Sequence, residues 1–201
     1  MSGVAQVQLS RVRGAGLRPH LDALAALRIE VFREWPYLYD GDAAYERDYL
    51  QRYMASPDSV CVLAMARGQL VGAATGMPLS HEGASFQRAF IERGIAPDAV
   101  FYFGESVLLP AWRGQGIGQG FFDQREAFAH ALGYRITAFA SVDRASDDPR
   151  KPAGYRGNDA LWAKRGYERQ PGMTMILRWK EIGEEGESEK PLTFWLRRVD
   201  R

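Results

Sequence analysis

The chain has 201 residues, of which 46% are hydrophobic and 25% are charged, and its formal net charge is +1. This length suits a single domain over residues 1–201, and the composition is that of a globular protein rather than a disordered one. The balance of 26 basic and 25 acidic residues argues against nucleic acid as the main partner, which would require a basic stripe. No apolar run is long enough to span a membrane, and the N-terminus lacks a signal-peptide pattern. The expected compartment is therefore the cytoplasm.

Few side chains are available for nucleophilic catalysis or metal binding. Cys61 is the only cysteine and lies in the apolar run Val-Cys-Val-Leu-Ala-Met at 60–65, so a buried hydrophobic role is favoured over that of a nucleophile. The histidines His20, His81 and His130 lack the close spacing of metal ligands, so we expect no metal site. A Ser-His-Asp triad is not excluded by counting, but no Gly-x-Ser-x-Gly elbow is present.

Hydrophobic periodicity in the first half of the chain predicts one strand, two helices and a hairpin. Pro36 and Gly41 both oppose helix and so separate the two helices. Arg67-Gly68 joins two β-leaning runs, which is typical of a hairpin. The predicted elements are a strand at 4–9, helices at 21–32 and 42–54, and strands at 59–66 and 69–76.

The second half alternates strands and helices around one continuous apolar run. The segment 100–109 is apolar almost throughout, which suits a central strand covered on both faces, and Pro110 ends it. Gly133 terminates the helix that follows. The predicted elements are a short helix at 86–93, a strand at 100–109, a helix from about 115 to 132, a strand at 134–142, a short helix at 159–165, and strands at 173–179 and 192–199.

Two irregular segments interrupt this second half. The proline- and charge-rich loop at 143–157 is long enough to act as a lid. The acidic connector at 181–189 is expected to be a solvated loop rather than a binding patch. The last strand follows this connector and could pair with a second copy in a homodimer. With no internal repeat and no clear linker, the order β-α-α-β-β-(α)-β-α-β-α-β-β indicates one α+β domain.

The chemically informative segment is the turn Arg113-Gly-Gln-Gly-Ile-Gly118, which follows the apolar strand and opens the next helix. The first backbone N–H groups of a helix are unpaired and carry a partial positive charge, so they form an anion site. Gly114, Gly116 and Gly118 remove three β-carbons there, which gives a phosphate access to those amides. Arg113 adds a fixed positive charge. The pattern therefore predicts a diphosphate-binding turn.

The wider string Glu105-Ser-Val-Leu-Leu-Pro-Ala-Trp-Arg-Gly-Gln-Gly-Ile-Gly118 resembles the cofactor motif of the GNAT acetyltransferase superfamily, in which [Arg/Gln]-x-x-Gly-x-[Gly/Ala] joins a strand to a helix. The segment Leu161-Trp-Ala-Lys-Arg-Gly-Tyr167 is similar to the family's Phe-Tyr-x-x-x-Gly-Phe segment. The element order matches as well, so the resemblance covers nearly the whole chain. It implies a mostly antiparallel central sheet that is splayed at strands four and five and flanked by helices.

The resemblance also implies an activity, in which a primary amine attacks the thioester of acetyl-CoA directly, without a covalent acyl-enzyme and without a metal. A small amine is the expected acceptor, and a peptide amine stays open. The pantetheine arm would form hydrogen bonds with the backbone of the central strand. An N–H group of that strand would stabilise the oxyanion that develops on the thioester carbonyl. The residues so implied in coenzyme A binding are Leu108, Leu109, Arg113, Gly114, Gln115, Gly116, Ile117, Gly118, Gln119 and Trp162.

Two residues are candidates for proton transfer. Glu105 lies in an apolar run, where burial favours a carboxyl group able to take a proton, so it is the candidate base. The alternative for Glu105 is a buried ion pair with an arginine. The family often has a tyrosine acid where this chain has Trp162, whose indole N–H is not a usable acid. Tyr155 is the candidate replacement, with Tyr167 as a second, and packing is the alternative role of Trp162.

The acceptor is expected to bind in the aromatic and acidic loop after the first helix, where the family builds acceptor pockets. Glu34, Tyr37 and Tyr39 lie in this loop and would suit a cationic amine. Ordinary core and solvated-loop roles are the alternative for each of them.

Two other functions compete with this interpretation. A dinucleotide-binding domain also has glycines at a strand-to-helix turn, but Gly-x-Gly-x-x-Gly is not satisfied, since its last glycine would fall at Gln119 or Phe121. A catalytically silent sensor or structural module that binds acyl-CoA is the other candidate, and Trp162 is the feature that keeps it open.

Overall fold

The computed structural model describes residues 6–199, and the chain forms two compact units, each assembled from three separate segments. The first unit contains the residues up to Val31, then Gly41–Met77 and Phe103–Gly133. The second contains Phe32–Asp40, Pro78–Tyr102 and the residues from Tyr134 onward. Each unit has its own sheet, helices and core.

The first unit is built on an antiparallel sheet with the strand order β1-β2-β3-β5. Arg67 and Gly68 form the turn between β2 and β3 with φ of 50° and 78°, the backbone that a two-residue hairpin requires. The strand predicted at 4–9 lies further along the chain, and its first two positions fall outside the described residues. The strands are β1 Gln8–Val12, β2 Val60–Ala66, β3 Gln69–Pro78 and β5 Ser106–Leu108.

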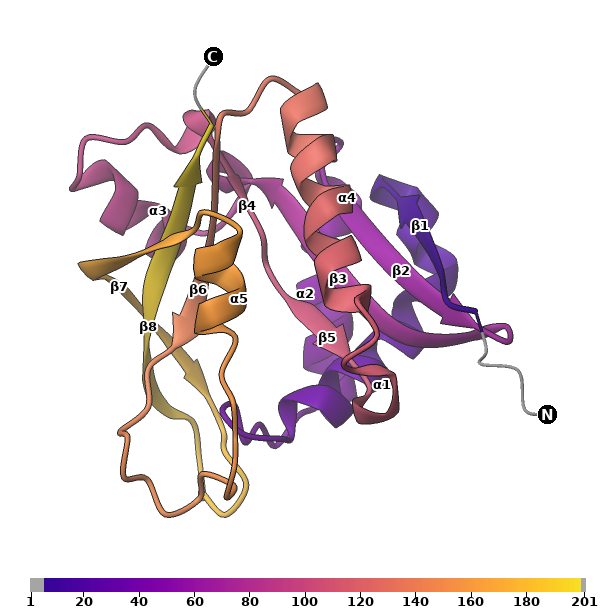
Figure 1. The fold of residues 1–201 in the computed structure, drawn as a ribbon, viewed down its shortest axis with the longest axis vertical. Helices are drawn as coiled ribbons and strands as arrows, with labels where there is room; N and C mark the ends of the chain where they lie inside the picture. Colours follow the sequence, from indigo (N-terminus) through magenta and orange to yellow (C-terminus); the bar gives the residue numbers. More distant parts are fainter. Residues whose placement is uncertain (1–5, 200–201) are drawn as a thin grey trace. The chain divides into compact units, whose positions relative to one another are not determined.

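Helices cover both faces of this first sheet. The helix α4 (Ile117–Ala131) packs against β1, β2 and β5 on one face, and α1 (Leu21–Phe32) and α2 (Ala43–Ala55) lie on the other face (Figure 1). The predicted second helix is confirmed, and the Asp42 carboxylate caps it by accepting hydrogen bonds from the backbone N–H groups of Ala44 and Tyr45. The short 3-10 helices Gly14–His20 and Pro110–Trp112 precede α1 and α4.

The second unit has a sheet with the order β4-β6-β8-β7, in which only the β4–β6 pair is parallel. Successive strand residues face opposite sides: Phe194 packs on Phe90 of α3 with ring centroids 4.8 Å apart, and Trp195 packs on Trp162 of α5 at 5.2 Å. The two helices therefore cover opposite faces. The elements are α3 Ala84–Ile91, β4 Val100–Tyr102, β6 Ile136–Val142, α5 Asp159–Lys164, β7 Glu168–Trp179 and β8 Ser188–Arg198, with 3-10 helices at Leu79–His81 and Pro97–Ala99.

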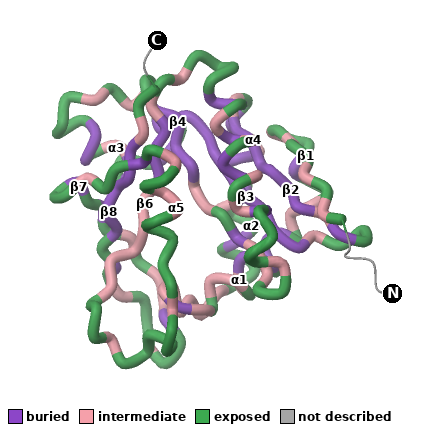
Figure 2. Tube along the Cα trace, in the orientation of Figure 1, coloured by how far each residue is buried: buried purple, intermediate pink, exposed green. Residues whose placement is uncertain are grey.

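Strands β2 and β3 of the first unit and β8 of the second carry long runs of buried residues, whereas β1, β7 and most connecting loops are largely exposed (Figure 2). The core of the second unit lies between α3 and its sheet and includes Leu79, Phe86, Phe90, Tyr102, Met173 and Phe194. The predicted α+β class is confirmed, with mostly antiparallel pairing and helices on the sheet faces.

One predicted element is wrong in its extent. The expected continuous strand at 100–109 is two short strands, β4 and β5, which pair with β6 and β3 respectively. Between them, Gly104 N–H donates to the carbonyl of Thr75 at 3.1 Å, and Thr75 N–H donates to the carbonyl of Glu105 at 3.0 Å. An apolar run indicates burial on both faces, but it does not indicate where a strand changes its partner.

Smaller differences concern the ends of other elements. The helix expected from about Gln115 begins at Ile117, because Gly116 before it has a left-handed backbone with φ of 80°. The last two strands are longer than predicted and begin at Glu168 and Ser188. No helix within residues 6–199 is long and apolar enough to cross a membrane.

Candidate functional site

The turn between β5 and α4 is exposed, and open space surrounds its three glycines. Gly114 and Gly116 have φ of 76° and 80°, so the backbone itself requires glycine at both positions. Gly118 lies within α4, and a β-carbon there would meet no atom within 4 Å. A glycine within a helix lowers its stability. Neither the backbone conformation of Gly118 nor its packing within the protein requires glycine at this position. The open space at Gly118 is what a ligand on the turn requires.

The start of α4 presents backbone N–H groups to this open space. The helical ladder begins with Gly120 N–H, which donates to the carbonyl of Gly116 at 3.1 Å. The amides of Ile117, Gly118 and Gln119 come before it and have no partner within the helix. Together with the positive end of the helix dipole, they can bind a diphosphate.

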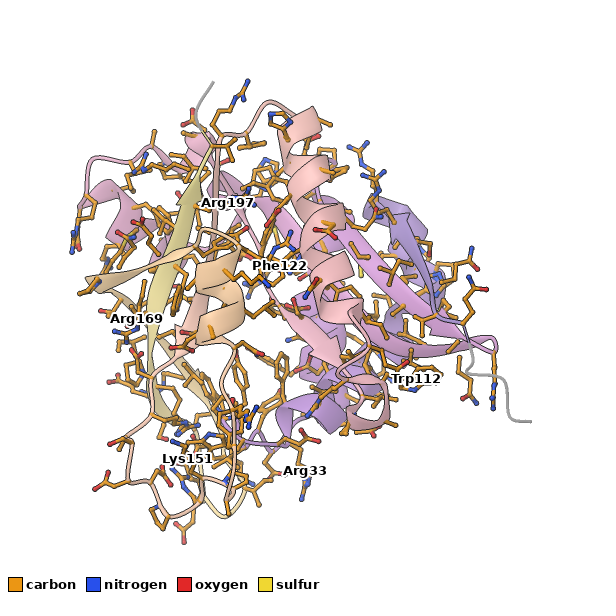
Figure 3. All side chains as sticks on the ribbon, viewed as in Figure 1. Arg33, Trp112, Phe122, Lys151, Arg169 and Arg197 are labelled. Carbon is orange, nitrogen blue, oxygen red and sulfur yellow. The ribbon has the colours of Figure 1, made fainter. Side chains whose placement is uncertain are left out.

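Side chains tie this turn to the end of β5. Arg113 Nε donates to the carbonyl of Leu108 at 3.0 Å, and Gln115 Nε2 donates to the carbonyl of Ala111 at 3.3 Å. Leu109 N–H donates to Val71 of β3 at 3.0 Å. Trp112 lies next to the turn (Figure 3). The structure thus brings the predicted cofactor residues at 108–119 together along one strand end and one helix start.

The carboxylate of Glu105 lies in the interior of the first unit. One of its oxygens is 2.5 Å from Arg28 Nη1, and the other accepts a hydrogen bond from the Tyr49 hydroxyl at 2.9 Å. The Glu105 side chain is 6% exposed. Of the two roles considered for this residue, the structure shows the buried ion pair with an arginine; whether Glu105 also accepts a proton stays a prediction.

Arg28 bridges two buried glutamates. Besides Glu105, it pairs with Glu46, whose side chain is 1% exposed. Burial alone lowers the pKa of Arg28, but the negative charges around it, with Glu105 first among them, raise that pKa well above its ordinary value. The guanidinium is therefore a permanent cation beside the Glu105 carboxylate.

A second buried arginine, Arg125 of α4, holds the backbone around Glu105. Its Nη1 donates to the carbonyls of Thr75 and Glu105 at 3.1 and 3.0 Å, and its Nη2 donates to Ser106 Oγ at 2.8 Å. Its guanidinium also lies 5.0 Å from the ring of Phe122, which is labelled in Figure 3. Arg125 therefore connects the helix that carries the glycine turn to the strand that carries Glu105.

Sequence reasoning assigned no role to Arg28, Tyr49 or Arg125. A signal existed for the two arginines, because each falls on the apolar stripe of its helix. Arg28 follows Leu24 by four positions, and Arg125 follows Phe121 by four. A charged residue on a buried helical face needs a partner, so such positions point to a buried polar network.

Cys61 lies on β2 in the same unit and is 3% exposed. Burial raises the pKa of its thiol, and the nearby Glu105 carboxylate raises it further. The predicted role of a buried hydrophobic residue is confirmed.

In the second unit, Trp162 packs within an aromatic cluster. Its ring centroid is 4.9 Å from that of Phe139 and 5.2 Å from that of Trp195. Tyr167 is buried and shares a 2.9 Å hydrogen bond with Thr137 Oγ1. The packing role considered for Trp162 is therefore observed, and the bond of Tyr167 is a structural one.

Tyr155 and the loop at 34–40 contribute half-buried aromatic rings to the same unit. Tyr155 lies edge-on to Trp35 at 6.3 Å. Tyr37 lies between Phe32, at 4.6 Å, and Trp179, at 5.9 Å. These contacts hold the loop in place while leaving the rings partly exposed.

The backbone of this loop is also fixed. The carbonyl of Glu34 accepts hydrogen bonds from the N–H groups of Tyr37 and Leu38 at 3.1 and 3.0 Å. Tyr39 forms a β-bridge with Glu181. The hydrogen bond from Lys180 lowers the pKa of Asp40, so the negative charge of Asp40 at the end of this loop is already paired with a neighbouring cation.

Glu181 is the anchor of the irregular segments in the second unit. Its carboxylate is 2.5 Å from Arg144 Nη2, 2.6 Å from Arg150 Nη1 and 3.3 Å from Lys190 Nζ, and its side chain is 2% exposed. Arg144 Nε also donates to the carbonyl of Pro36 at 2.7 Å. The prediction of a purely solvated connector is wrong at Glu181, because acidic composition does not show which carboxylate finds buried cationic partners.

The described part of the chain, residues 6–199, contains no group of three or more His, Cys, Asp or Glu side chains that could hold a metal ion.

Comparison with known proteins places this geometry in context. The model of the acetyltransferase (GNAT) family matches residues 24–151. A search of curated proteins found no match.

Solved acetyltransferases share the fold over almost the whole chain. The ribosomal-protein-alanine N-acetyltransferase from Brucella melitensis has a TM-score of 0.61 and 15% identity, covering 96% of this chain and 99% of that chain. An N-acetyltransferase from Staphylococcus aureus Mu50 has a TM-score of 0.62 and 13% identity, covering 98% and 100%. The PaiA N-acetyltransferase from Thermoplasma acidophilum, solved in complex with coenzyme A, has a TM-score of 0.58 and 11% identity, covering 96% and 99%. At such identities the likeness shows the fold alone.

Proposed function

This chain belongs to the GNAT acetyltransferase family, and from that premise we propose that it moves the acetyl group of acetyl-CoA to the primary amine of a small molecule. The amine nitrogen attacks the thioester carbonyl, a C–N bond forms, and the C–S bond breaks to release coenzyme A as a thiolate. Backbone N–H groups support the oxyanion in between. Counted from the ammonium form, the nitrogen loses two protons, one to the enzyme before it attacks and one after the C–N bond has formed. The thiolate gains one proton, and the other leaves to solvent.

The observation that carries this proposal is the open glycine turn before α4. Gly118 has no neighbour that would exclude a side chain, and the amides at 117–119 precede the helical ladder. The diphosphate of acetyl-CoA fits such a site, because it bears the negative charge that those amides and Arg113 attract. That the PaiA structure contains coenzyme A supports a CoA-based donor.

We assign the proton transfers to Glu105 and Tyr155. Glu105 pairs with Arg28 through one carboxylate oxygen, and a carboxylate is a group that can accept a proton, as a base must. Tyr155 would donate to the departing thiolate, and it is half-buried and held edge-on to Trp35. A thiol with an ordinary pKa of about 8.5 is already a fair leaving group, so loss of Tyr155 should slow the reaction without abolishing it.

The acceptor would contact the loop at 34–40. Glu34, Tyr37 and Tyr39 are half-buried, so their outer surfaces are available for a cationic amine. Aromatic faces and a carboxylate attract an ammonium group, which favours a positively charged acceptor.

A silent acyl-CoA-binding module is the second candidate. The observation that favours it is Trp162, which packs against Phe139 and Trp195 at the place where the family often has its acid. Such a module would bind coenzyme A but would release no thiol in the presence of amines.

One set of measurements tests both candidates. A ligand at a hundred times its Kd stabilises the native state by about 2.7 kcal/mol, so acetyl-CoA should raise the melting temperature, pantetheine should raise it less, and NAD should leave it unchanged. Gly118→Glu should abolish the response to acetyl-CoA and keep the fold. Acceptor-dependent release of free thiol then supports the enzyme, and binding without any thiol release supports the module. If acetyl-CoA fails to stabilise the wild type, both candidates are wrong.

A further inference from the structure

A half-buried tyrosine on α2 donates a hydrogen bond into the buried network around Glu105. We propose that Tyr49 relays the proton from the acceptor ammonium to Glu105, an inference that rests on the proposed acetyl transfer. The Tyr49 hydroxyl donates to Glu105 Oε2 at 2.9 Å, and Tyr49 is half-buried. The Glu105 side chain, in contrast, is 6% exposed.

The first argument is that both oxygens of the Glu105 carboxylate are engaged. Oε1 pairs with Arg28 Nη1 at 2.5 Å, and Oε2 accepts the Tyr49 hydroxyl. An amine that approached Glu105 directly would have to enter the interior beside these groups, because the carboxylate is nearly buried. A proton that arrives on the Tyr49 oxygen needs no such entry, because the existing hydrogen bond already leads to Oε2.

The second argument is electrostatic. The Arg28 guanidinium lies 4.1 Å from the centroid of the Tyr49 ring, and that of Arg52 lies 5.6 Å from it. Two cations beside one ring favour negative charge on its phenol oxygen as the proton moves on. The charged and titratable groups near Glu105 and Tyr49 are Arg28 from α1, Glu46, Arg52 and Tyr53 from α2, Cys61 from β2 and Arg125 from α4.

The third argument concerns how the Tyr49 hydroxyl is held. It lies 3.2 Å from the hydroxyl of Tyr53, a fully buried residue. Because the single hydroxyl hydrogen of Tyr49 points to Glu105, Tyr53 donates in this second bond. The resulting order, Tyr53 to Tyr49 to Glu105, orients every hydroxyl hydrogen toward the carboxylate.

The proposed step balances without any other reactant. An N–H bond of the ammonium breaks and its proton forms a new O–H bond with Tyr49, while the original O–H bond of Tyr49 breaks and its proton binds Glu105 Oε2. The amine keeps the electron pair of the N–H bond and uses it to attack the thioester. Tyr49 ends as it began, and Glu105 is neutral until it returns the proton to solvent.

Tyr49→Phe removes the hydroxyl alone, and Tyr45→Phe is the matched control, since Tyr45 is on the same helix and 52% exposed. With an alkylamine at neutral pH, Tyr49→Phe should lower kcat on the order of a hundredfold and leave KM for acetyl-CoA unchanged, while Tyr45→Phe should match the wild type. The loss should shrink as the pH rises toward the amine pKa of about 10.4, because an amine that is already neutral needs no relay. A merely structural defect would lower kcat by the same factor at every pH, and that result, or no loss of kcat, overturns the proposal.

A second measurement needs no variant and covers the case in which Tyr49→Phe fails to fold. In mixtures of H2O and D2O, a relay moves two protons together, so the single-turnover rate of the wild type should curve with the deuterium fraction. A linear dependence or no dependence overturns the relay. Failure of the proposed function is distinguishable from either result, because the wild type would then release no thiol with any amine.

Discussion

Arg28 Nη1 lies 2.5 Å from a carboxylate oxygen of Glu105, and both side chains are less than a tenth exposed. Water cannot compensate either charge at this depth, so each ion depends on the other. Because Arg28 also pairs with Glu46, its removal would leave two buried carboxylates without their cation.

Arg28→Met should therefore destabilise the protein by about 3–5 kcal/mol, the cost of leaving a buried charge unpaired. The matched control is Arg47→Met, because Arg47 pairs with Asp22 at 2.7 Å but the two side chains are 49% and 83% exposed. Exposed pairs contribute about 0–1 kcal/mol. Urea unfolding of both variants measures their free energies of unfolding. Similar losses of stability in the two would contradict the conclusion that burial makes the Arg28 pair the more important one.

Two glycines at opposite ends of α4 should respond to alanine with opposite signs. Gly118 lies in the helix with open space around it, so Gly118→Ala should stabilise the protein by up to about 1 kcal/mol. Gly133 follows the same helix with φ of 90°, so Gly133→Ala should destabilise it by about 1–2 kcal/mol. Thermal melting measures both effects.

The same helix tests the ligand turn. The family motif accepts glycine or alanine at position 118, so acetyl-CoA should raise the melting temperature of Gly118→Ala as it raises that of the wild type. The longer, negatively charged side chain of Gly118→Glu would occupy the predicted diphosphate site and repel the phosphates, so this variant should show no response, while Gly133→Ala should retain it in full. A full response in Gly118→Glu would show that the diphosphate binds elsewhere.

The structural features that could be predicted from the sequence are those that depend on residues close together along the chain. The glycine turn at 113–118 could be read from residues within a few positions, since it joins one strand end to one helix start. The ion pair of Arg28 with Glu105 could not, because it joins α1 to a segment far along the chain. The end of β4 at Tyr102 was missed for the same reason, as strand pairing is decided by tertiary contacts rather than by an apolar run.

Gly104 lies in the interruption between β4 and β5, which the sequence did not predict. A β-carbon on Gly104 would lie 2.0 Å from the Tyr53 hydroxyl and 2.7 Å from Thr75 Oγ1, closer than atoms can approach. Gly104→Ala should thus destabilise the protein by about 1–3 kcal/mol through overpacking. Adding Tyr53→Phe removes the nearest obstacle, so the double variant should lose less stability than the sum of the two single variants. Denaturant unfolding of all four proteins measures this coupling, and strict additivity would mean that the clash is relieved in another way.

Glu181 should be a determinant of acid stability. Burial raises the pKa of Glu181, but its hydrogen bonds with Arg144 and Arg150 outweigh this, and the net pKa is lowered from 4.5. Hydrogen bonds from the Glu181 N–H and then from Ser188 lower the pKa of Glu184 from 4.5 to about 2. A carboxyl whose pKa is lower in the folded state stabilises that state above the unfolded pKa, and this stabilisation is lost as the pH falls through the folded value. The wild type should therefore lose stability as the pH falls below 4.5.

Glu181→Gln should remove most of the Glu181 contribution. At neutral pH this variant should be less stable by about 3–5 kcal/mol, because Arg144 and Lys190 lose the buried anion between them. The stability of this variant should also fall less steeply than that of the wild type below pH 4.5, because it lacks one carboxyl group whose pKa is lowered in the folded state. Glu189→Gln is the matched control from the same connector, because Glu189 pairs with Arg178 while 67% exposed, and the wild-type pH dependence should persist there. Chemical unfolding across acidic and neutral pH measures both effects. If Glu181→Gln kept the wild-type acid slope, the carboxylate that anchors these loops would have to be a different one.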